Sequence, residues 1–393
     1  GKAGLPLAAV IADSGQDVIG VDLDESRVEM INNGNNPIEE EFGLGELISK
    51  YCGNKLIATS DPEYAAINSK VHIIIVPLLI GQDNNPDFSI IEKALENLGK
   101  GLKKEDVVVL ETTVPPKTTE TLIKDRLEKY SNLRAGEDFY LAYSPERIMT
   151  GYSISRFKEF PKLVGGINNI STEKAFEIYQ KFSSPVKVSN SRTAELAKVS
   201  EGVFRDVNIA LANELYKVSE SYEIDFWELK NAANHRFCNI HEPGNVGGHC
   251  IPVYPWFLIN NLDVPLVKKA RELNDSMLNY YVEKIDTILS QNGKKNSNAK
   301  IGIVGLSYRE GVKEDQFSRS VDLIKILTDK GYKLQGYDPL FSNEDINNLF
   351  QIEPILNYED LDVIIIMNKE TSLKGKLIEF KHKVVDVKNS LMS

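Results

Sequence analysis

Cysteine is scarce in this sequence, and so are long apolar runs and any excess of positive charge. Three cysteines among 393 residues cannot build a disulfide framework, which favours a reducing, cytoplasmic compartment. The apolar runs, such as 73–80, are the length of strands and well short of the roughly 18 residues that indicate a membrane span. The formal net charge of −11 argues against a nucleic-acid partner.

What the sequence does contain is typical of a globular protein with sizeable cores. Hydrophobic residues make up 42% of the chain and charged residues 26%, which excludes a disordered or fibrous protein. At roughly 100–200 residues per domain, the length predicts two or three domains.

The order of the patterns predicts two α/β domains separated by helices. In the first half, strand-like segments alternate with helical patterns, which is typical of a mostly parallel sheet with helices on both faces. The predicted strands are 17–22, 71–77, 106–111, 139–144, 162–166 and 186–189, and the predicted helices include 25–32, 88–98 and 117–130.

A different pattern begins near residue 191. A long helix is predicted over about 193–223, and helical patterns continue to about 291 around a Pro- and Gly-rich loop at 239–255. After a polar linker at 292–298, a second α/β run has predicted strands at 301–307, 333–337, 363–367 and 384–387. We therefore predict three domains over 1–190, 191–292 and 293–393: two Rossmann-like doubly wound domains joined by a helical one.

The chain opens on Gly1-x-x-Gly4, followed by a helical pattern and a strand that ends in Asp22. In a doubly wound sheet, the strand before such glycines is central. No strand precedes them here, so we expect the native chain to continue upstream of Gly1. An intact mass above that of this sequence would support the expectation.

This opening also carries the signal for a dinucleotide. Gly1 and Gly4 are half of the glycine fingerprint, and a carboxylate about 20 residues later accepts hydrogen bonds from the ribose hydroxyls of NAD and repels a 2′-phosphate. Asp22 has this place, although a plain turn would also end in an aspartate. Arg27, in the next helix, faces either the pyrophosphate or solvent. The pattern predicts an NAD site.

Cys250 follows Gly247-Gly248-His249, a loop that lets the backbone approach a ligand and leaves the thiol open. We predict that Cys250 is a nucleophile rather than an inert thiol. A nucleophilic cysteine needs a lowered pKa, and a nearby cation is the usual means. Lys198 is a candidate for this cation, although its position in the sequence is also typical of a surface lysine. The Cys and His spacings match no zinc site, so no metal is predicted.

Two segments follow predicted strands, where ligands bind in such sheets. Glu111-Thr112-Thr113-Val114-Pro115 follows one strand, and Ser144-Pro145-Glu146-Arg147 follows the other. Their hydroxyls and carboxylates are suited to binding a substrate. The alternative interpretation is that each segment is only a turn closed by a proline.

Together, these motifs resemble the UDP-glucose/GDP-mannose dehydrogenase family over nearly the whole chain. The matching segments are 1–8, 112–115, 144–147, 194–198, 205–210 and 247–252. The resemblance implies an oxidoreductase that uses two NAD to oxidise C6 of a nucleotide sugar to a carboxylate through a thiohemiacetal and a thioester on a cysteine. It favours UDP-N-acetylmannosamine or another UDP-N-acetylhexosamine as substrate, with UDP-glucose as the alternative.

The resemblance also implies site residues. It makes Cys250 the nucleophile, Lys198 the oxyanion stabiliser, Glu146 the residue that handles water and Thr113 a contact to the reacting centre and the cofactor. The residues it places at the nucleotide sugar are Glu146, Arg147, Lys198, Arg205, Asn208, Arg236, Gly247 and Arg309. In the family, the arginine matched by Arg236 reaches the sugar across a dimer interface.

Three positions depart from the family pattern. Gly202 stands where many members have Asn, Tyr254 where many have Asp, and Gln316 where the last domain has Arg. These departures leave open a catalytically impaired nucleotide-binding dimer, and a simple two-electron dehydrogenase would not need Cys250. The yield of NADH per sugar distinguishes the three hypotheses. The four-electron enzyme gives two NADH, the impaired protein none and the two-electron dehydrogenase one.

The long central helix predicts a homodimer or a higher even oligomer. A helix that links two domains has few partners in its own chain, and large apolar surfaces usually mark interfaces. Its apolar residues are Leu196, Val199, Val203, Phe204, Val207, Ala210, Leu211 and Leu215.

Overall fold

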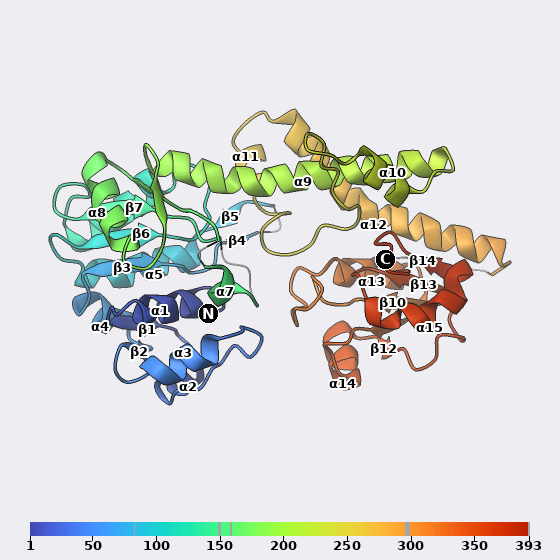
Figure 1. The fold of residues 1–393 in the computed structure, drawn as a ribbon, viewed down its shortest axis with the longest axis horizontal. Helices are drawn as coiled ribbons and strands as arrows, with labels where there is room; N and C mark the ends of the chain where they lie inside the picture. The colour runs from blue at the N-terminus through green and yellow to red at the C-terminus, as the bar shows by residue number, and fades with distance from the viewer. Residues whose placement is uncertain (82, 148–150, 158, 295–298, 392–393) are drawn as a thin grey trace. The chain divides into compact units, whose positions relative to one another are not determined.

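A computed structural model describes residues 1–81, 83–147, 151–157, 159–294 and 299–391. The chain forms two compact units, Gly1–Glu201 and Gly202–Ser393, and each is described by itself. Figure 1 shows that each unit has a sheet with helices packed on it, which is the predicted α/β class.

The first unit contains a five-stranded sheet in the order β3-β6-β7-β8-β9 and a separate parallel pair, β1-β2. Its strands are β1 (Val18–Val21), β2 (Leu56–Thr59), β3 (Val71–Ile74), β4 (Leu79–Ile80), β5 (Pro86–Asp87), β6 (Val107–Leu110), β7 (Tyr140–Tyr143), β8 (Lys162–Gly166) and β9 (Pro185–Lys187). Most pairs are parallel, as predicted, because helices connect successive strands. Strand β8 runs antiparallel to β7, and β4 and β5 form an antiparallel hairpin.

The helices of this unit cover the sheets and bury their apolar faces. They are α1 (Gly4–Asp13), α2 (Glu25–Asn32), α3 (Leu44–Tyr51), α4 (Pro62–Ile67), α5 (Ser89–Gly101), α6 (Lys124–Ser131), α7 (Ser153–Arg156) and α8 (Asn169–Tyr179). The predicted helix at 117–130 begins instead with a π-helical turn, η1 (Thr119–Ile123). Strands β6 and β7 are buried at every residue, which explains their continuous apolar sequence.

The predicted long helix is α9 (Ser191–Ser221), which passes from the first unit into the second. It is followed by α10 (Phe226–Ala233), α11 (Trp256–Ile259) and α12 (Pro265–Gln291). The predicted linker at 292–298 begins where α12 ends, and its last residues, 295–298, lie outside the described residues.

The rest of the second unit is a fully parallel sheet in the order β12-β11-β10-β13-β14. Its strands are β10 (Lys300–Val304), β11 (Lys333–Tyr337), β12 (Glu353–Pro354), β13 (Val363–Ile366) and β14 (Val384–Val385). The helical segments are α13 (Arg319–Asp329), α14 (Asn343–Asp345), η3 (Ile346–Phe350), η4 (Thr371–Leu373), α15 (Lys374–Leu377) and η5 (Ile378–Lys383). One core joins this sheet to α12 through Met277, Tyr281 and Ile285.

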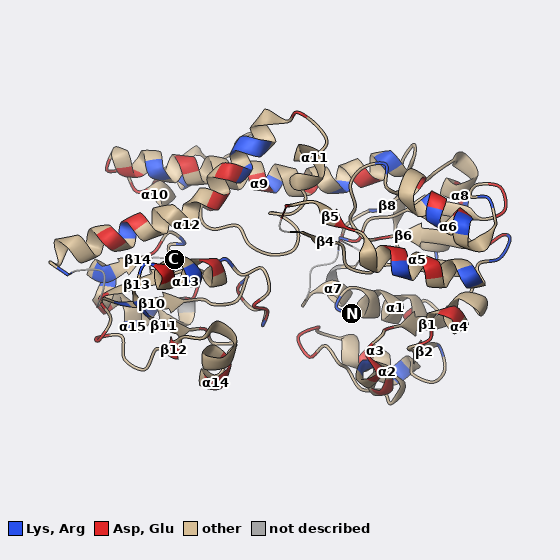
Figure 2. Ribbon diagram, turned by 180° about the vertical axis from the view of Figure 1, so that it is seen from behind, with Lys and Arg blue, Asp and Glu red and all other residues tan. Residues whose placement is uncertain are grey.

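Charged residues of both signs are interspersed along the exposed helices, as on α5 and α12 in Figure 2. In the part of the chain that the structure describes, no helix has the length and hydropathy needed to cross a bilayer.

Candidate active site

The predicted cofactor residues come together at the start of the first unit. Helix α1 begins at Gly4, where an added Cβ would lie 3.1 Å from Cγ2 of Ile75, so the glycine lets the helix start close to the end of β3. The backbone nitrogen of Gly1 lies 2.8 Å from Oδ2 of Asp22, and the Arg27 guanidinium lies 3.9 Å from the same oxygen. A carboxylate beside a helix N-terminus suits the ribose and pyrophosphate of NAD, so these residues fit the group.

The predicted substrate segments lie at neighbouring strand ends. Thr113 follows β6 and Glu146 follows β7, and the two strands pair in parallel with Leu110 opposite Tyr143. The backbone N–H of Glu146 donates to the carbonyl of Glu111 at 3.3 Å, which joins the two segments directly. The structure therefore places Thr113 and Glu146 along the same edge of the sheet.

Two contacts tie these segments to α9, on either side of Lys198. The buried Glu195 carboxylate accepts the backbone N–H groups of Lys117 at 2.6 Å and Thr119 at 2.8 Å. Burial raises the pKa of Glu195 to about 7, against the hydrogen bonds that lower it. Glu201 accepts a hydrogen bond from the guanidinium of Arg147.

Glu195 and Glu201 lie three residues before and three after Lys198, so all three share one side of the helix. The half-buried Lys198 therefore lies on the side of α9 that holds the Thr113 and Glu146 segments. The Arg147 guanidinium also donates to the carbonyl of Pro161 at 2.6 Å. In the structure, this side chain therefore connects its own segment to Pro161 and to Glu201 of α9. Its predicted contact with substrate stays a prediction.

Cys250 belongs to the second unit, in a loop that packs on the segment between β10 and α13. The Gly248 N–H donates to the carbonyl of Phe317 at 3.0 Å, and Gly248 has a φ of +91°. The His249 ring makes edge contacts with the rings of Tyr308, 5.9 Å away, and Phe317, 4.6 Å away. The Cys250 side chain is exposed, as a nucleophile requires, and its carbonyl accepts the first hydrogen bonds of the turn that leads to α11.

This packing brings two predicted substrate positions into one region of the second unit. A Cβ on Gly247 would lie 2.8 Å from the carbonyl oxygen of Phe317, so only glycine fits there without a shift. Arg309 follows Tyr308 in the contacting segment and lies 5.8 Å from the centre of its ring. Gln316, one of the three departures, is exposed in the same segment, and nothing in the structure explains it.

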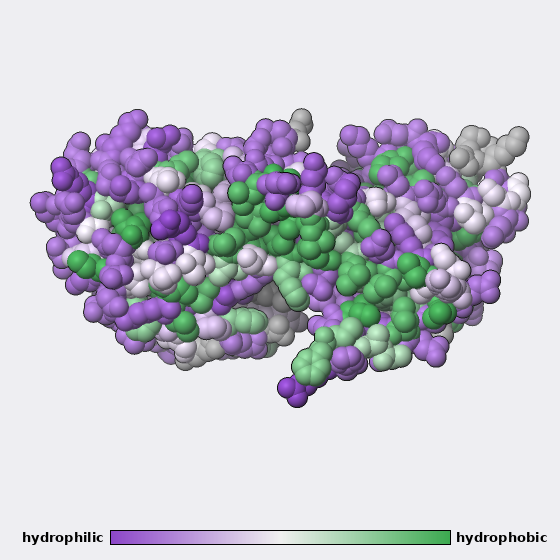
Figure 3. Space-filling view, turned by 90° about the horizontal axis from the view of Figure 1, so that it is seen from above, coloured by the Kyte–Doolittle hydropathy of each residue, from purple (hydrophilic) through white to green (hydrophobic). Residues whose placement is uncertain are grey.

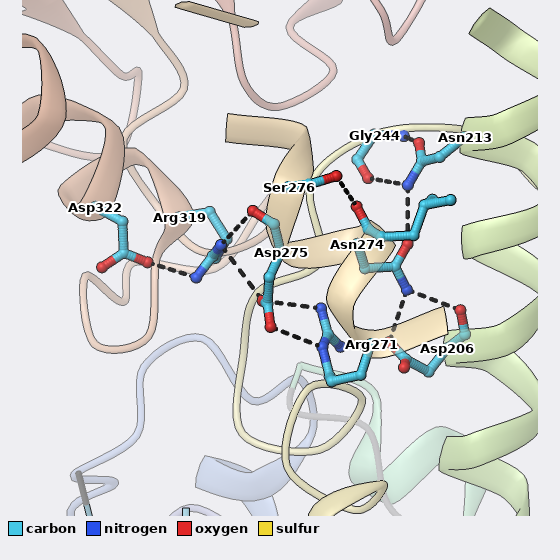
Figure 4. Close-up of polar contacts among 10 residues, drawn as sticks. Asp206, Asn213, Gly244, Arg271, Asn274, Asp275, Ser276, Arg319 and Asp322 are labelled. Carbon is cyan, nitrogen blue, oxygen red and sulfur yellow. Dashed lines mark hydrogen bonds and ion pairs between the residues drawn. The ribbon is translucent and has the colours of Figure 1, made fainter. Parts of the chain in front are cut away.

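A buried polar network fixes the start of the cysteine loop against α9 and α12 (Figure 4). Asn213 of α9 binds both backbone groups of Gly244, at 2.6 and 3.0 Å, and donates to Asn274 of α12 at 2.9 Å. Asn274 in turn donates to Asp206 at 2.9 Å, and Asp206 pairs with Arg271, which is 1% exposed. Burial raises the pKa of Asp206 to about 6 although the Arg271 charge opposes the rise.

The other two departures from the family pattern contact each other. Gly202 is buried in α9, and a Cβ there would lie 2.5 Å from Cδ2 and 3.1 Å from Cβ of Tyr254. The Tyr254 side chain is 8% exposed and its ring stacks on Phe257 at 5.8 Å. The tyrosine therefore occupies the volume next to the helix that a residue larger than glycine would need, and the two substitutions form one packing unit.

The remaining predicted site residues are Arg205 and Asn208 on α9 and Arg236 in the segment after α10. Arg205 is exposed, Asn208 donates to the carbonyl of Phe204 at 2.7 Å, and Arg236 is exposed and lies 4.8 Å from the ring centre of Phe237. The structure does not bring Arg236 to a site within its own unit. Among the described residues, no group of three or more His, Cys, Asp or Glu side chains is arranged to hold a metal ion.

Sequence reasoning assigned no role to Lys162, Glu195 or Glu201, and it named Glu111 only as part of a segment. Lys162 opens an apolar strand, where an ion is unusual, and this is the only local signal that marks it. Apart from the Lys162–Glu146 contact, which joins residues 16 apart, the side-chain contacts of these four residues join residues 51 to 78 apart in the chain.

Comparison with known proteins matches three descriptions of one family along the chain. Residues 1–183 match the NAD binding domain, 192–276 the central domain and 302–392 the UDP binding domain of the UDP-glucose/GDP-mannose dehydrogenase family. The chain is 35% identical to UDP-N-acetyl-D-mannosamine dehydrogenase of Methanococcus aeolicus, over 100% of this chain and 90% of that protein. It is 34% identical to the Campylobacter jejuni enzyme of the same name, over 94% of each.

Solved structures agree with the sequence comparison. The UDP-D-ManNAc dehydrogenase of Pyrococcus horikoshii has a TM-score of 0.88 at 30% identity, over 98% of this chain and 91% of that one. The UDP-N-acetyl-mannosamine dehydrogenase of Staphylococcus aureus has a TM-score of 0.85 at 30% identity, over 100% and 94%.

The fold, the matched domains and the site at the ends of β6 and β7 together define the class of protein. It is a nucleotide-sugar dehydrogenase that uses NAD. The chain belongs to the UDP-glucose/GDP-mannose dehydrogenase family. The predicted family, fold class, enzyme class and cofactor are thereby confirmed.

Proposed function

We propose that the protein oxidises the C6 alcohol of UDP-N-acetylmannosamine to the carboxylate, with the consumption of two NAD. The names of the relatives that share about a third of its residues support this substrate. The observation that carries the four-electron reaction is the exposed thiol of Cys250, in a loop held by backbone contacts on both sides. A two-electron dehydrogenase has no need of such a thiol.

In the proposed reaction, Cys250 keeps the intermediate on the enzyme between the two oxidations. Its thiolate adds to the C6 aldehyde to give a thiohemiacetal, and oxidation of that adduct leaves a thioester. Water then attacks the thioester carbonyl, the C–S bond breaks, and the electron pair returns to sulfur. NAD, when bound, accepts the hydride in each oxidation.

We assign the other catalytic roles to side chains of the first unit. Lys198 stabilises the oxyanion that forms at C6, Glu146 positions and deprotonates the water, and Thr113 holds the reacting centre and the cofactor through its hydroxyl. Their segments are tied together by Glu195 and by the Arg147–Glu201 pair. This arrangement supports one shared site for the three residues.

The binding roles follow the family resemblance. We assign NAD to Gly1, Gly4, Asp22, Arg27 and Thr113. We assign the nucleotide sugar to Glu146, Arg147, Lys198, Arg205, Asn208, Arg236, Gly247 and Arg309. The contact between the Gly247 loop and the Arg309 segment supports a common sugar site for these two positions.

We also propose that the protein is a homodimer, or a higher even oligomer, that assembles through α9. Phe204, Leu211 and Val218 recur every seven residues on this helix and remain 44–59% exposed. Figure 3, a view from above, shows apolar surface on the side of the molecule where α9 lies in Figure 1. A stripe of this kind is typical of a helix interface.

The division into domains at 1–190, 191–292 and 293–393 remains part of the proposal, as does a cytoplasmic location. All three cysteines are free thiols, and the reaction requires a reduced Cys250.

Counting NADH per molecule of sugar tests the function directly. The protein is incubated with limiting amounts of UDP- and GDP-sugars and excess NAD. We expect two NADH from UDP-N-acetylmannosamine. One NADH would contradict the four-electron reaction, a response to UDP-glucose alone would replace the substrate, and no NADH from any sugar would favour an impaired nucleotide-binding protein.

A further inference from the structure

A buried cluster of ionisable side chains lies directly behind Glu146. Strand β8 runs antiparallel to β7 with Ala142 opposite Gly166 and Tyr143 opposite Gly165. When this register is continued three residues outward, Glu146 lies opposite Lys162. The parallel pairing of β6 with β7 brings Glu111 to the same place from the other side.

The contacts in this cluster are short, and its side chains are largely buried. Lys162 Nζ lies 2.6 Å from Oε2 of Glu111 and 2.6 Å from Oε2 of Glu146. The exposed fraction of the side chain is 7% for Lys162, 0% for Glu111 and 14% for Glu146. The hydroxyl of Tyr179 donates to the second oxygen of Glu111, and the backbone N–H of Arg147 donates to Oε1 of Glu146 at 2.6 Å. Glu146 is the most exposed of these three side chains.

The electrostatics separate the two carboxyl groups. Burial raises the pKa of Glu111 to about 8, against the attraction of Lys162, and the neighbouring charge of Glu146 adds to the rise. Burial acts in the same direction on Glu146, but Lys162 and hydrogen bonds from Glu111 and Arg147 lower its pKa below the ordinary value. Burial opposes the charge of Lys162, yet the two carboxyl groups raise its pKa. The pKa values of the two carboxyl groups are thus shifted in opposite directions, so that a proton is held more readily by Glu111 than by Glu146.

A purely structural purpose explains this cluster poorly. Burying a lysine with two carboxyl groups costs several kcal/mol of desolvation, which apolar residues of the same volume avoid. Two interacting carboxyl groups with separated pKa values are instead typical of acid–base sites.

We propose that Lys162 and Glu111 are positioning residues that hold Glu146 as an oriented, ionised base for hydrolysis of the thioester. The inference rests on the role proposed above for Glu146. Lys162 fixes one oxygen of Glu146 and keeps it negative, and protonated Glu111 donates a hydrogen bond to Glu146 from behind. The other oxygen of Glu146 is directed by the Arg147 N–H.

The proton balance of the step follows from this arrangement. A water O–H bond breaks as its oxygen bonds to the thioester carbon, and the proton passes to Glu146. The tetrahedral intermediate collapses with loss of the Cys250 thiolate. Both carboxyl groups are then neutral beside the Lys162 cation, so the cluster carries a net positive charge that favours release of the proton to solvent.

The first test replaces Lys162 and follows the two halves of the reaction separately. Lys162→Met is mixed with UDP-N-acetylmannosamine and NAD, and NADH release and the mass of the protein are recorded. We expect a rapid burst of two NADH per site, an adduct on Cys250, and a steady rate about 10- to 100-fold below that of the unchanged protein, because a general base contributes this much or more. Lys162→Arg keeps the charge and restores most of the rate.

Lys383 provides a matched control. It is a buried lysine, 8% exposed, whose ammonium group binds the carbonyls of Tyr358, Glu359 and Leu361 instead of carboxylates. Lys383→Met removes a buried cation of the same kind and leaves no adduct on Cys250. Equal behaviour of the two methionine variants would overturn the proposal.

The second test uses Glu111→Gln, and it does not depend on whether Lys162→Met folds. Glutamine has the shape of a protonated glutamic acid and, like it, can both donate and accept a hydrogen bond. The groups that face Glu111 are Lys162, Glu146, Tyr179 and Tyr143, and burial raises the pKa of both tyrosines well above its ordinary value. Because the pKa of Glu111 is raised to about 8, the proposal predicts that Glu111 ionises and loses its hydrogen bond to Glu146 above about this pH.

We therefore expect Glu111→Gln to turn over within about threefold of the unchanged protein at pH 7 and to keep its steady rate at higher pH. Identical pH profiles for the two proteins, or inactivity of Glu111→Gln at pH 7, would overturn the proposal. Failure of the proposed function would give a different result from failure of this inference. Full turnover by Cys250→Ser would show that the reaction does not pass through a thioester at all.

Discussion

Substitution of Gly202 by alanine tests whether Tyr254 fills the space beside α9. Gly→Ala inside a helix ordinarily raises the free energy of unfolding by about 0.5–1 kcal/mol, because alanine loses less backbone entropy. Here the added methyl group would lie 2.5 Å from a ring atom of Tyr254. The ring is buried and stacked on Phe257, and a clash of this kind in a packed core costs about 1–3 kcal/mol.

The clash exceeds the helical gain, so we expect Gly202→Ala to destabilise the protein by up to about 2 kcal/mol. In a Tyr254→Ala background, the same substitution loses its obstacle and becomes stabilising by about 0.5–1 kcal/mol. The difference between the two backgrounds, about 1–3 kcal/mol, is the coupling energy of the pair.

Urea unfolding followed by circular dichroism on the four proteins of this cycle measures the coupling. Gly375→Ala is the control, because Gly375 lies in helix α15 with no atom within 4 Å of its added methyl group. It should be neutral or stabilising in either background. A stabilised Gly202→Ala, or a coupling below about 0.5 kcal/mol, would show that the ring does not fill this space.

Three further predictions concern the proposed function. Cys250→Ser should bind NAD normally and form no uronate, because an alcohol at neutral pH is a far weaker nucleophile than a thiolate; product analysis that finds uronate would refute this. Asp22→Ala should weaken NAD binding in titrations about 10- to 100-fold, through loss of charge-assisted hydrogen bonds worth about 1.5–3 kcal/mol each, and equal use of NADP by the unchanged protein would contradict the assignment. Leu211→Glu should shift the protein from dimer to monomer in light scattering and lower its activity, whereas Lys383→Met should stay dimeric; a fully active monomer would refute both the interface and the role of Arg236.

The predicted fold rested on signals that are local in the chain. Alternating strand and helix patterns located β1, β3, β6, β7, β8 and β9 in the first unit, and the Gly- and Pro-free stretch located α9. Short elements such as β2 and α3 lacked a clear period and were not predicted. The antiparallel direction of β8 was not predicted either, because the residues of a strand do not encode which way it pairs.

For the candidate site as well, some features were predictable from the sequence and others only from the tertiary structure. The sequence alone determined the family, the cofactor and the candidate residues Cys250 and Asp22, since each stands in a short motif whose chemistry depends on neighbouring residues. Only the tertiary structure decided what surrounds Glu146. Lys162 and Glu111 are 51 residues apart and meet because β8 reverses its direction beside β7.

Tertiary structure also decided how two departures from the family pattern relate to each other. Gly202 and Tyr254 look independent in the sequence, but they share one volume between α9 and the turn after Cys250. A motif records which groups are available, whereas volume and buried charge are properties of residues that folding brings together. For this reason the sequence specified the chemistry of the site, and packing specified the partners that tune it.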